Sequence, residues 1–105
     1  MTKVYQKGVS RLLSLEEQQE LENSVAEDPL FWPVIRGTSG VRKARFAIGN
    51  KGKRGGGRVC YLYLQLHEVV YMLLAYTKNE QEDLTEREKK QIKQLVEFIK
   101  ETEGV

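Results

Sequence analysis

The sequence is poor in the side chains that usually build metal centres and disulfides. Its 105 residues include one cysteine, Cys60, and one histidine, His67. A single cysteine cannot form an internal disulfide, and one cysteine with one histidine cannot complete a zinc cage. Cys60 lies in an apolar run, where the expected role is that of a small buried side chain. We therefore expect no metal site and no small-molecule cofactor.

Long apolar runs are also missing from the sequence. No stretch approaches the roughly 18 apolar residues that a membrane span requires. The N-terminal segment, MTKVYQK, has no apolar core of signal-peptide length. The composition, 40% apolar and 30% charged, is ordinary for a globular protein. We therefore expect a single domain over residues 1–105, located in the cytoplasm and without a membrane partner.

Acidic residues are absent from one long stretch. Between Pro29 and His67 there is no Asp or Glu, while residues 36–58 carry eight of the 17 Lys and Arg. The net charge is only +2, so the other residues sum to 9 − 15 = −6. A block of one sign attracts a polyanion such as a phosphate backbone. A solvated basic face without a specific partner is the alternative, although charge runs usually mix both signs. The eight cations are Arg36, Arg42, Lys43, Arg45, Lys51, Lys53, Arg54 and Arg58.

The remaining pattern predicts an α+β fold. Ser14-Leu-Glu-Glu17 and Thr85-Glu-Arg-Glu88 are capping boxes, which predict helices over about 15–27 and about 86–102. The second helix would bury a stripe of Ile92, Leu95, Val96 and Ile99. The expected strands are 41–48, 58–66 and 69–77, in an antiparallel meander whose last two strands form a hairpin around His67-Glu68. A short helix within 6–13 and an edge strand over 2–5 are further possibilities, which gives three to four strands.

Two predicted loops and one acidic segment have distinctive compositions. Residues 30–40 predict a loop that tucks its aromatic side chains against the core. Residues 49–57, GNKGKRGGG, predict a flexible basic loop. This loop is neither a Walker A motif nor a dinucleotide fingerprint, because Arg58 and a strand follow it instead of a helix. Residues 16–28 hold six acids and no base, as expected of a solvated helix face.

The expected sheet concentrates several cations. Alternation along 41–48 places Lys43 and Arg45 on one face, with Ala44, Phe46 and Ile48 on the other. Arg58 opens the next strand, facing outward, and Lys78 leaves the third strand near the same end. Such convergence suits RNA cleavage by attack of a 2′-hydroxyl on the adjacent phosphate, since the cations would stabilise the added negative charge. A lysine crowded by other cations could also act as the base.

Three segments resemble a known family. They are VIRGTSGVRKARF at 34–46, KGKRGGGRV at 51–59 and LLAYTKNEQEDLT at 73–85. In this order and spacing they resemble the RelE-type toxins of bacterial toxin–antitoxin systems, and in particular the HigB-like branch of the RelE/ParE superfamily. The resemblance implies a RelE-like fold, with N-terminal helices on a small antiparallel sheet and a C-terminal helix.

The resemblance also implies a function. The implied protein is a toxin that inhibits translation as a ribosome-dependent, metal-independent mRNA endoribonuclease. A cognate antitoxin, which we expect to be a small helix-turn-helix protein, would block it. By position, Lys43, Arg45, Arg58 and Lys78 match the catalytic cations, and Arg58 is expected to hold the scissile phosphate. The cations expected to bind RNA or the ribosome are Arg42, Lys51, Lys53 and Arg54.

Two positions depart from the pattern of the family. RelE toxins carry a tyrosine after the last strand, where this chain has Asp83-Leu84-Thr85, and they carry an arginine where this chain has Asn79. Tyr76 is the nearest tyrosine and is expected to belong to the core. Two other functions stay open: a non-catalytic module that binds RNA or the ribosome, and a ParE-like inhibitor of DNA gyrase.

Overall fold

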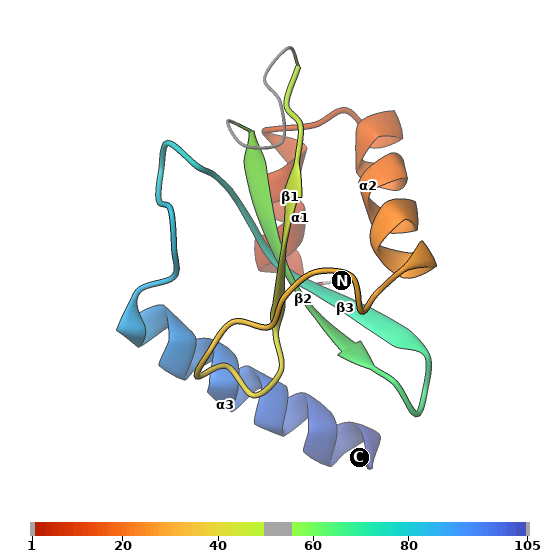
Figure 1. The fold of residues 1–105 in the computed structure, drawn as a ribbon, viewed down its shortest axis with the longest axis vertical. Helices are drawn as coiled ribbons and strands as arrows, with labels where there is room; N and C mark the ends of the chain where they lie inside the picture. Colours follow the sequence, from red (N-terminus) through yellow and green to blue (C-terminus); the bar gives the residue numbers. More distant parts are fainter. Residues whose placement is uncertain (1, 50–55, 105) are drawn as a thin grey trace.

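The protein has an α+β fold in which helices cover both faces of an antiparallel sheet (Figure 1). A computed structural model describes residues 2–49 and 56–104, so Lys51, Lys53 and Arg54 of the basic loop lie outside the described residues. The predicted fold class is confirmed within these ranges. The elements are α1 (Lys3–Ser10), α2 (Leu15–Glu27), β1 (Arg42–Phe46), β2 (Gly57–Leu64), β3 (Val69–Thr77) and α3 (Glu86–Glu103).

The two longer helices begin at the capping boxes that the sequence predicted. The Ser14 hydroxyl accepts a hydrogen bond from the Glu17 amide at 3.2 Å, and the Glu17 carboxylate accepts one from the Ser14 amide at 2.9 Å. Thr85 and Glu88 form the same reciprocal pair at the start of α3. Each pair satisfies two amides that would otherwise lack a partner, which fixes where the helix starts.

The N-terminal segment forms a helix, so the edge strand predicted over residues 2–5 is wrong. The Thr2 hydroxyl accepts a hydrogen bond from the Tyr5 amide at 3.1 Å and donates one to the Leu73 carbonyl at 2.9 Å. The first contact caps α1, and the second ties its start to β3. Gly8 lets α1 approach the sheet closely, because a Cβ atom there would lie 2.4 Å from the Ala75 carbonyl oxygen.

The sheet has the strand order β1-β2-β3, with both pairs antiparallel as predicted. Two core clusters lie on its opposite faces. One contains Tyr5, Val9, Leu21 and Val25 of the N-terminal helices, and the other contains Ile92, Val96 and Ile99 of α3. Leu95, predicted to share the buried stripe of α3, is 37% exposed. Within residues 2–49 and 56–104, no helix has the length and hydrophobicity of a membrane span.

The loop between α2 and β1 differs from its predicted packing. Phe31 is 68% exposed and meets the half-buried Trp32 edge to face, with ring centroids 5.1 Å apart. The loop is held by polar contacts instead: the Tyr61 hydroxyl donates to the Pro29 carbonyl at 2.8 Å, and the Arg42 guanidinium donates to the carbonyls of Leu30 and Trp32. Only part of the aromatic loop therefore packs against the core.

Candidate functional site

The pairing of β1 with β2 brings three predicted site cations onto one face of the sheet. Arg45 and Arg58 are direct cross-strand partners, and Lys43 is the partner of Cys60. Directly opposed residues of antiparallel strands point to the same face, and residues two apart on one strand also share a face. Cys60 belongs to the core cluster beneath α3. Lys43, Arg45 and Arg58 therefore lie on the α3 side of the sheet, and we call these three residues the cation face.

Arg45 and Arg58 differ strongly in exposure. Arg45 is exposed, whereas Arg58 is only 3% exposed, so the predicted outward orientation of Arg58 is wrong. The physical reason is the position of β2 as the central strand, where Arg58 lies between Arg45 of β1 and Tyr76 of β3. Its Nη1 donates to the Gly57 carbonyl at 3.1 Å. An anion bound over the two guanidinium groups would interact favourably with both charges.

Lys43 pairs with an acidic residue that the sequence reasoning did not assign to the site. Its Nζ lies 2.7 Å from Oδ1 of Asp83, which belongs to the segment between β3 and α3. The hydrogen bond and charge of Lys43 lower the pKa of the Asp83 carboxyl, with smaller contributions from the charges of Lys89 and Arg58. Asp83 is therefore a carboxylate at neutral pH, in reach of three cations. The one hint of it in the sequence was its place after the last strand, where the toxins that the sequence resembles carry a tyrosine.

The floor of the site is buried and uncharged. Tyr76 is 3% exposed, as expected for a core residue, and its hydroxyl has no hydrogen-bond partner among the described residues. Burial raises the pKa of Tyr76, and the neighbouring Cys60 raises it further. Burial also raises the pKa of the Cys60 thiol to about 12, although Tyr76 and Lys43 act in the opposite direction. Cys60 is buried as predicted, and its raised pKa keeps the thiol protonated at neutral pH, which makes it a poor nucleophile.

Lys78 and Arg42 occupy different positions relative to the cation face. The Lys78 amide donates to the Gly56 carbonyl at 3.1 Å, which places the Lys78 backbone beside the start of β2; its side chain is exposed. Arg42 precedes Lys43 and faces the other side of the sheet, opposite Tyr61, where its guanidinium holds the 30–32 loop. The structure therefore brings Lys78 to the end of the sheet where Arg58 lies, and keeps Arg42 away from the cation face.

Metal ligands do not gather in the described part of the chain. Among residues 2–49 and 56–104, no group of three or more His, Cys, Asp or Glu side chains is arranged to hold a metal ion. The charged groups near the site include the three cations of the cation face, Asp83 and Lys89. Such a set can bind a phosphate group and stabilise negative charge.

The sequence also matches the model of a known protein family. The model of the family described as "RelE toxin of RelE / RelB toxin-antitoxin system" matches residues 36–104, which is more than half of the chain. The matched stretch contains the cation face, Lys78 and Asp83, and excludes α1 and α2. A toxin of this kind acts together with a cognate antitoxin, which is therefore a partner of this protein. The chain belongs to the RelE toxin family.

Proposed function

We propose that this toxin cleaves mRNA on the ribosome, with the scissile phosphate bound at the cation face. Toxins of the RelE family are generally endoribonucleases. The observation that carries the proposal is the cross-strand placement of Arg45 opposite Arg58, with Lys43 on the same face. Three cations on one face of neighbouring strands favour a site that binds an anion, because their charges act together on a phosphate placed over that face.

The reaction we propose is attack of the 2′-hydroxyl on the adjacent phosphate. The 2′-oxygen forms a bond to phosphorus while the bond from phosphorus to the 5′-oxygen breaks. The 2′-hydroxyl loses a proton to a base, and the 5′-oxygen gains one. The products are a 2′,3′-cyclic phosphate and a 5′-hydroxyl. The nucleophile and leaving group both belong to the RNA, so the protein has to align them and stabilise the added charge.

The exposure of each cation suggests its role. Arg45 is exposed and can contact the phosphate directly, and the Lys43 ammonium lies beside it on the same strand face. Arg58 is buried, so we assign to it the stabilisation of the phosphate charge from within the sheet. Lys78, exposed beyond β3, would contact a flanking phosphate. The Lys43 side chain forms an ion pair with Asp83, and we assign it to the stabilisation of charge.

We also propose roles for the RNA-binding cations and for the ribosome. Lys51, Lys53 and Arg54 would contact ribosomal RNA or the mRNA backbone. Arg42 is left out of the RNA-binding set, because its guanidinium is bonded to the carbonyls of Leu30 and Trp32. The ribosome would supply the bent RNA conformation in which the 2′-hydroxyl is aligned with the scissile bond. The narrower assignment to the HigB-like branch and the helix-turn-helix character of the antitoxin stay predictions.

The proposal can be tested with purified ribosomes that hold an mRNA with a defined codon in the A site. We expect new 5′ ends inside that codon, no cleavage of the same mRNA without ribosomes, and no cleavage when the nucleotide before the scissile bond lacks its 2′-hydroxyl. Arg45→Gln should slow cleavage by about 100-fold, the usual effect of removing one charge-stabilising donor. Lys7→Gln on α1, which also removes an exposed cation, should leave the rate unchanged.

Two other results would replace the proposal. Arrest of translation without new 5′ ends would identify a non-catalytic ribosome binder. Inhibition of purified DNA gyrase, with intact mRNA, would identify a ParE-like activity.

A further inference from the structure

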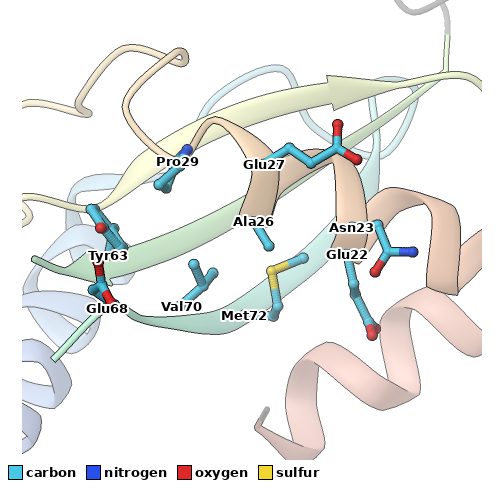
Figure 2. Close-up of a pocket in the computed structure, with 9 residues that line it drawn as sticks. All are labelled: Glu22, Asn23, Ala26, Glu27, Pro29, Tyr63, Glu68, Val70 and Met72. Atoms are coloured by element: carbon cyan, nitrogen blue, oxygen red, sulfur yellow. The ribbon is translucent and has the colours of Figure 1, made fainter.

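A second candidate surface lies on the opposite side of the sheet from the cation face. A groove of about 630 Å³ runs between the C-terminal half of α2 and the hairpin of β2 and β3. Its apolar lining consists of Ala26 and Pro29 on one side, and Val70 and Met72 of β3 with the Tyr63 ring on the other. Figure 2 shows Ala26, Val70 and Met72 facing one another between the helix and the sheet.

The rim of this groove is acidic. Glu22 and Glu27 come from α2, and Glu68 comes from the turn between β2 and β3. No Lys or Arg is among the described residues that line it. The Glu22 carboxylate accepts a hydrogen bond from the Tyr5 hydroxyl at 2.9 Å, whereas Glu27 and Glu68 are exposed. Two acidic residues of α2 therefore lie at this groove, whereas the sequence predicted only that the acids of residues 16–28 form a solvated helix face.

Glu68 adopts a backbone conformation that is unfavourable for its residue type. Its φ is 52°, in the left-handed region that glycine prefers. A non-glycine residue in this region costs on the order of 1 kcal/mol or more. This conformation belongs to the turn between β2 and β3, which places Glu68 at one end of the groove.

From these observations we infer that the groove binds a segment of the cognate antitoxin in which apolar side chains are flanked by Lys or Arg. This inference rests on membership of the RelE toxin family, whose toxins act together with an antitoxin, and it does not depend on the proposed cleavage of mRNA. The apolar floor selects apolar side chains, and the acidic rim selects cations and repels RNA. The bound segment would lie on the α1 and α2 side of the sheet and would leave the cation face uncovered.

The test is the affinity of the purified toxin for its purified cognate antitoxin, measured by calorimetry at several salt concentrations. The double variant Glu27→Lys with Glu68→Lys reverses the rim, and we expect it to weaken binding at least tenfold and to flatten the salt dependence. Ala26→Gln should weaken binding without a change of charge, because a larger polar side chain would cover the apolar floor. Ala26 is exposed on α2, and glutamine is a good helix former, so this variant should fold.

A matched control separates the groove from overall charge. Glu97→Lys with Glu101→Lys makes the same change of net charge on exposed positions of α3, and it should bind the antitoxin as the wild type does. Groove variants that bind within twofold of the wild type would overturn the inference, and so would equal losses in the groove and control variants. A concentration-dependent dimer of the toxin that only the groove variants lose would also overturn it, since the occupant would then be a second copy.

The binding measurement tests the groove separately from the proposed nuclease activity. None of the substituted residues belongs to the cation face, so ribosome-dependent cleavage without antitoxin should be the same in all variants. A wild-type toxin that cleaves no mRNA but loses antitoxin binding in the groove variants would refute the proposed function and leave the groove assignment standing. Cleavage as proposed, together with unaffected antitoxin binding, would refute the groove assignment alone.

Discussion

Lys43 and Asp83 are joined by an ion pair of 2.7 Å that links β1 to the segment between β3 and α3. The Asp83 side chain is 73% exposed, whereas that of Lys43 is 22% exposed. The carboxylate therefore covers part of the cation face from the solvent side. An incoming phosphate has the same charge as Asp83, so the two compete for Lys43.

This competition leads to our first prediction, that Asp83→Asn strengthens binding to ribosomes that carry mRNA. Removal of one negative charge from the site should raise the affinity several-fold at low salt and steepen the slope of log affinity against log salt by about 0.7. Filter binding over a range of salt concentrations measures both quantities. Glu82→Gln removes the neighbouring exposed charge and should have a smaller effect. Weaker binding in Asp83→Asn would show instead that the carboxylate helps to hold the RNA.

The second prediction concerns the buried Arg58. Arg58→Ala removes a large buried side chain together with a charge that stabilises Asp83, and we expect it to lower the free energy of unfolding by about 2–4 kcal/mol. Loss of toxicity in this variant would therefore be ambiguous. Arg58→Met keeps most of the volume, and we expect it to fold and to lose cleavage.

Arg58→Lys distinguishes charge from geometry at this position. Lysine retains the positive charge but lacks the planar donor fork of arginine, so we expect a folded protein whose cleavage is slowed more than tenfold. Urea denaturation measures the stability of each variant, and the ribosome assay measures cleavage. Full activity of Arg58→Met would remove Arg58 from the proposed site.

Much of the fold could be read from the sequence, because it depends on local signals. The capping boxes at Ser14 and Thr85 fixed the starts of two helices, and the alternation of Lys43 and Arg45 with Ala44 and Phe46 fixed the faces of β1. The N-terminus was less clear, since residues 2–5 suit either a strand or a helix. The tertiary hydrogen bond from Thr2 to the Leu73 carbonyl accompanies the helix, and no local pattern encodes it.

The site was only partly visible in the sequence, for a related reason. Alternation along β1 predicts which cations share a face, and this part agrees with the structure. Burial of Arg58 depends on β2 lying in the middle of the sheet, and the ion pair of Lys43 with Asp83 joins residues 40 positions apart. Both are consequences of long-range packing. The acidic groove could not be foreseen either, because it requires the placement of α2 over the hairpin.

The third prediction tests the start of β2, where Gly57 faces Phe46. A Cβ atom at Gly57 would lie 2.2 Å from Cζ of the Phe46 ring, closer than any van der Waals contact allows. We expect Gly57→Ala to lower the free energy of unfolding by about 1–3 kcal/mol, as overpacking of a core usually does. The measurement is urea denaturation with a two-state fit.

A second substitution shows whether the clash with the ring is the cause. Phe46→Leu replaces the ring by a smaller side chain, so Gly57→Ala should cost less in this background than in the wild type. The double-mutant cycle gives the difference as a coupling energy. Additive effects of the two substitutions would contradict the explanation.

The fourth prediction concerns pH and the link between α1 and the segment after β3. Glu80 accepts hydrogen bonds from the Arg11 guanidinium at 2.8 Å and from the amide and hydroxyl of Thr77. The hydrogen bond from Arg11 contributes most, and together these contacts lower the pKa of Glu80 from 4.5 to about 2. Because the folded pKa lies below the unfolded one, the resulting stability is complete above pH 4.5 and is lost as the pH falls towards 2.

We therefore expect Glu80→Gln to be less stable than the wild type at pH 7 and equal to it near pH 2. The side chains of Arg11 and Glu80 are about half exposed, so solvent screening reduces the expected loss to about 1 kcal/mol at pH 7. Urea denaturation at pH 7, 4 and 2.5 measures the difference at each step, and the other carboxyl groups cancel because both proteins contain them. Glu82→Gln, with the same change of charge two residues away, should match the wild type throughout. A loss in Glu80→Gln that persists undiminished at pH 2.5 would mean that the glutamate acts through its shape and not through its charge.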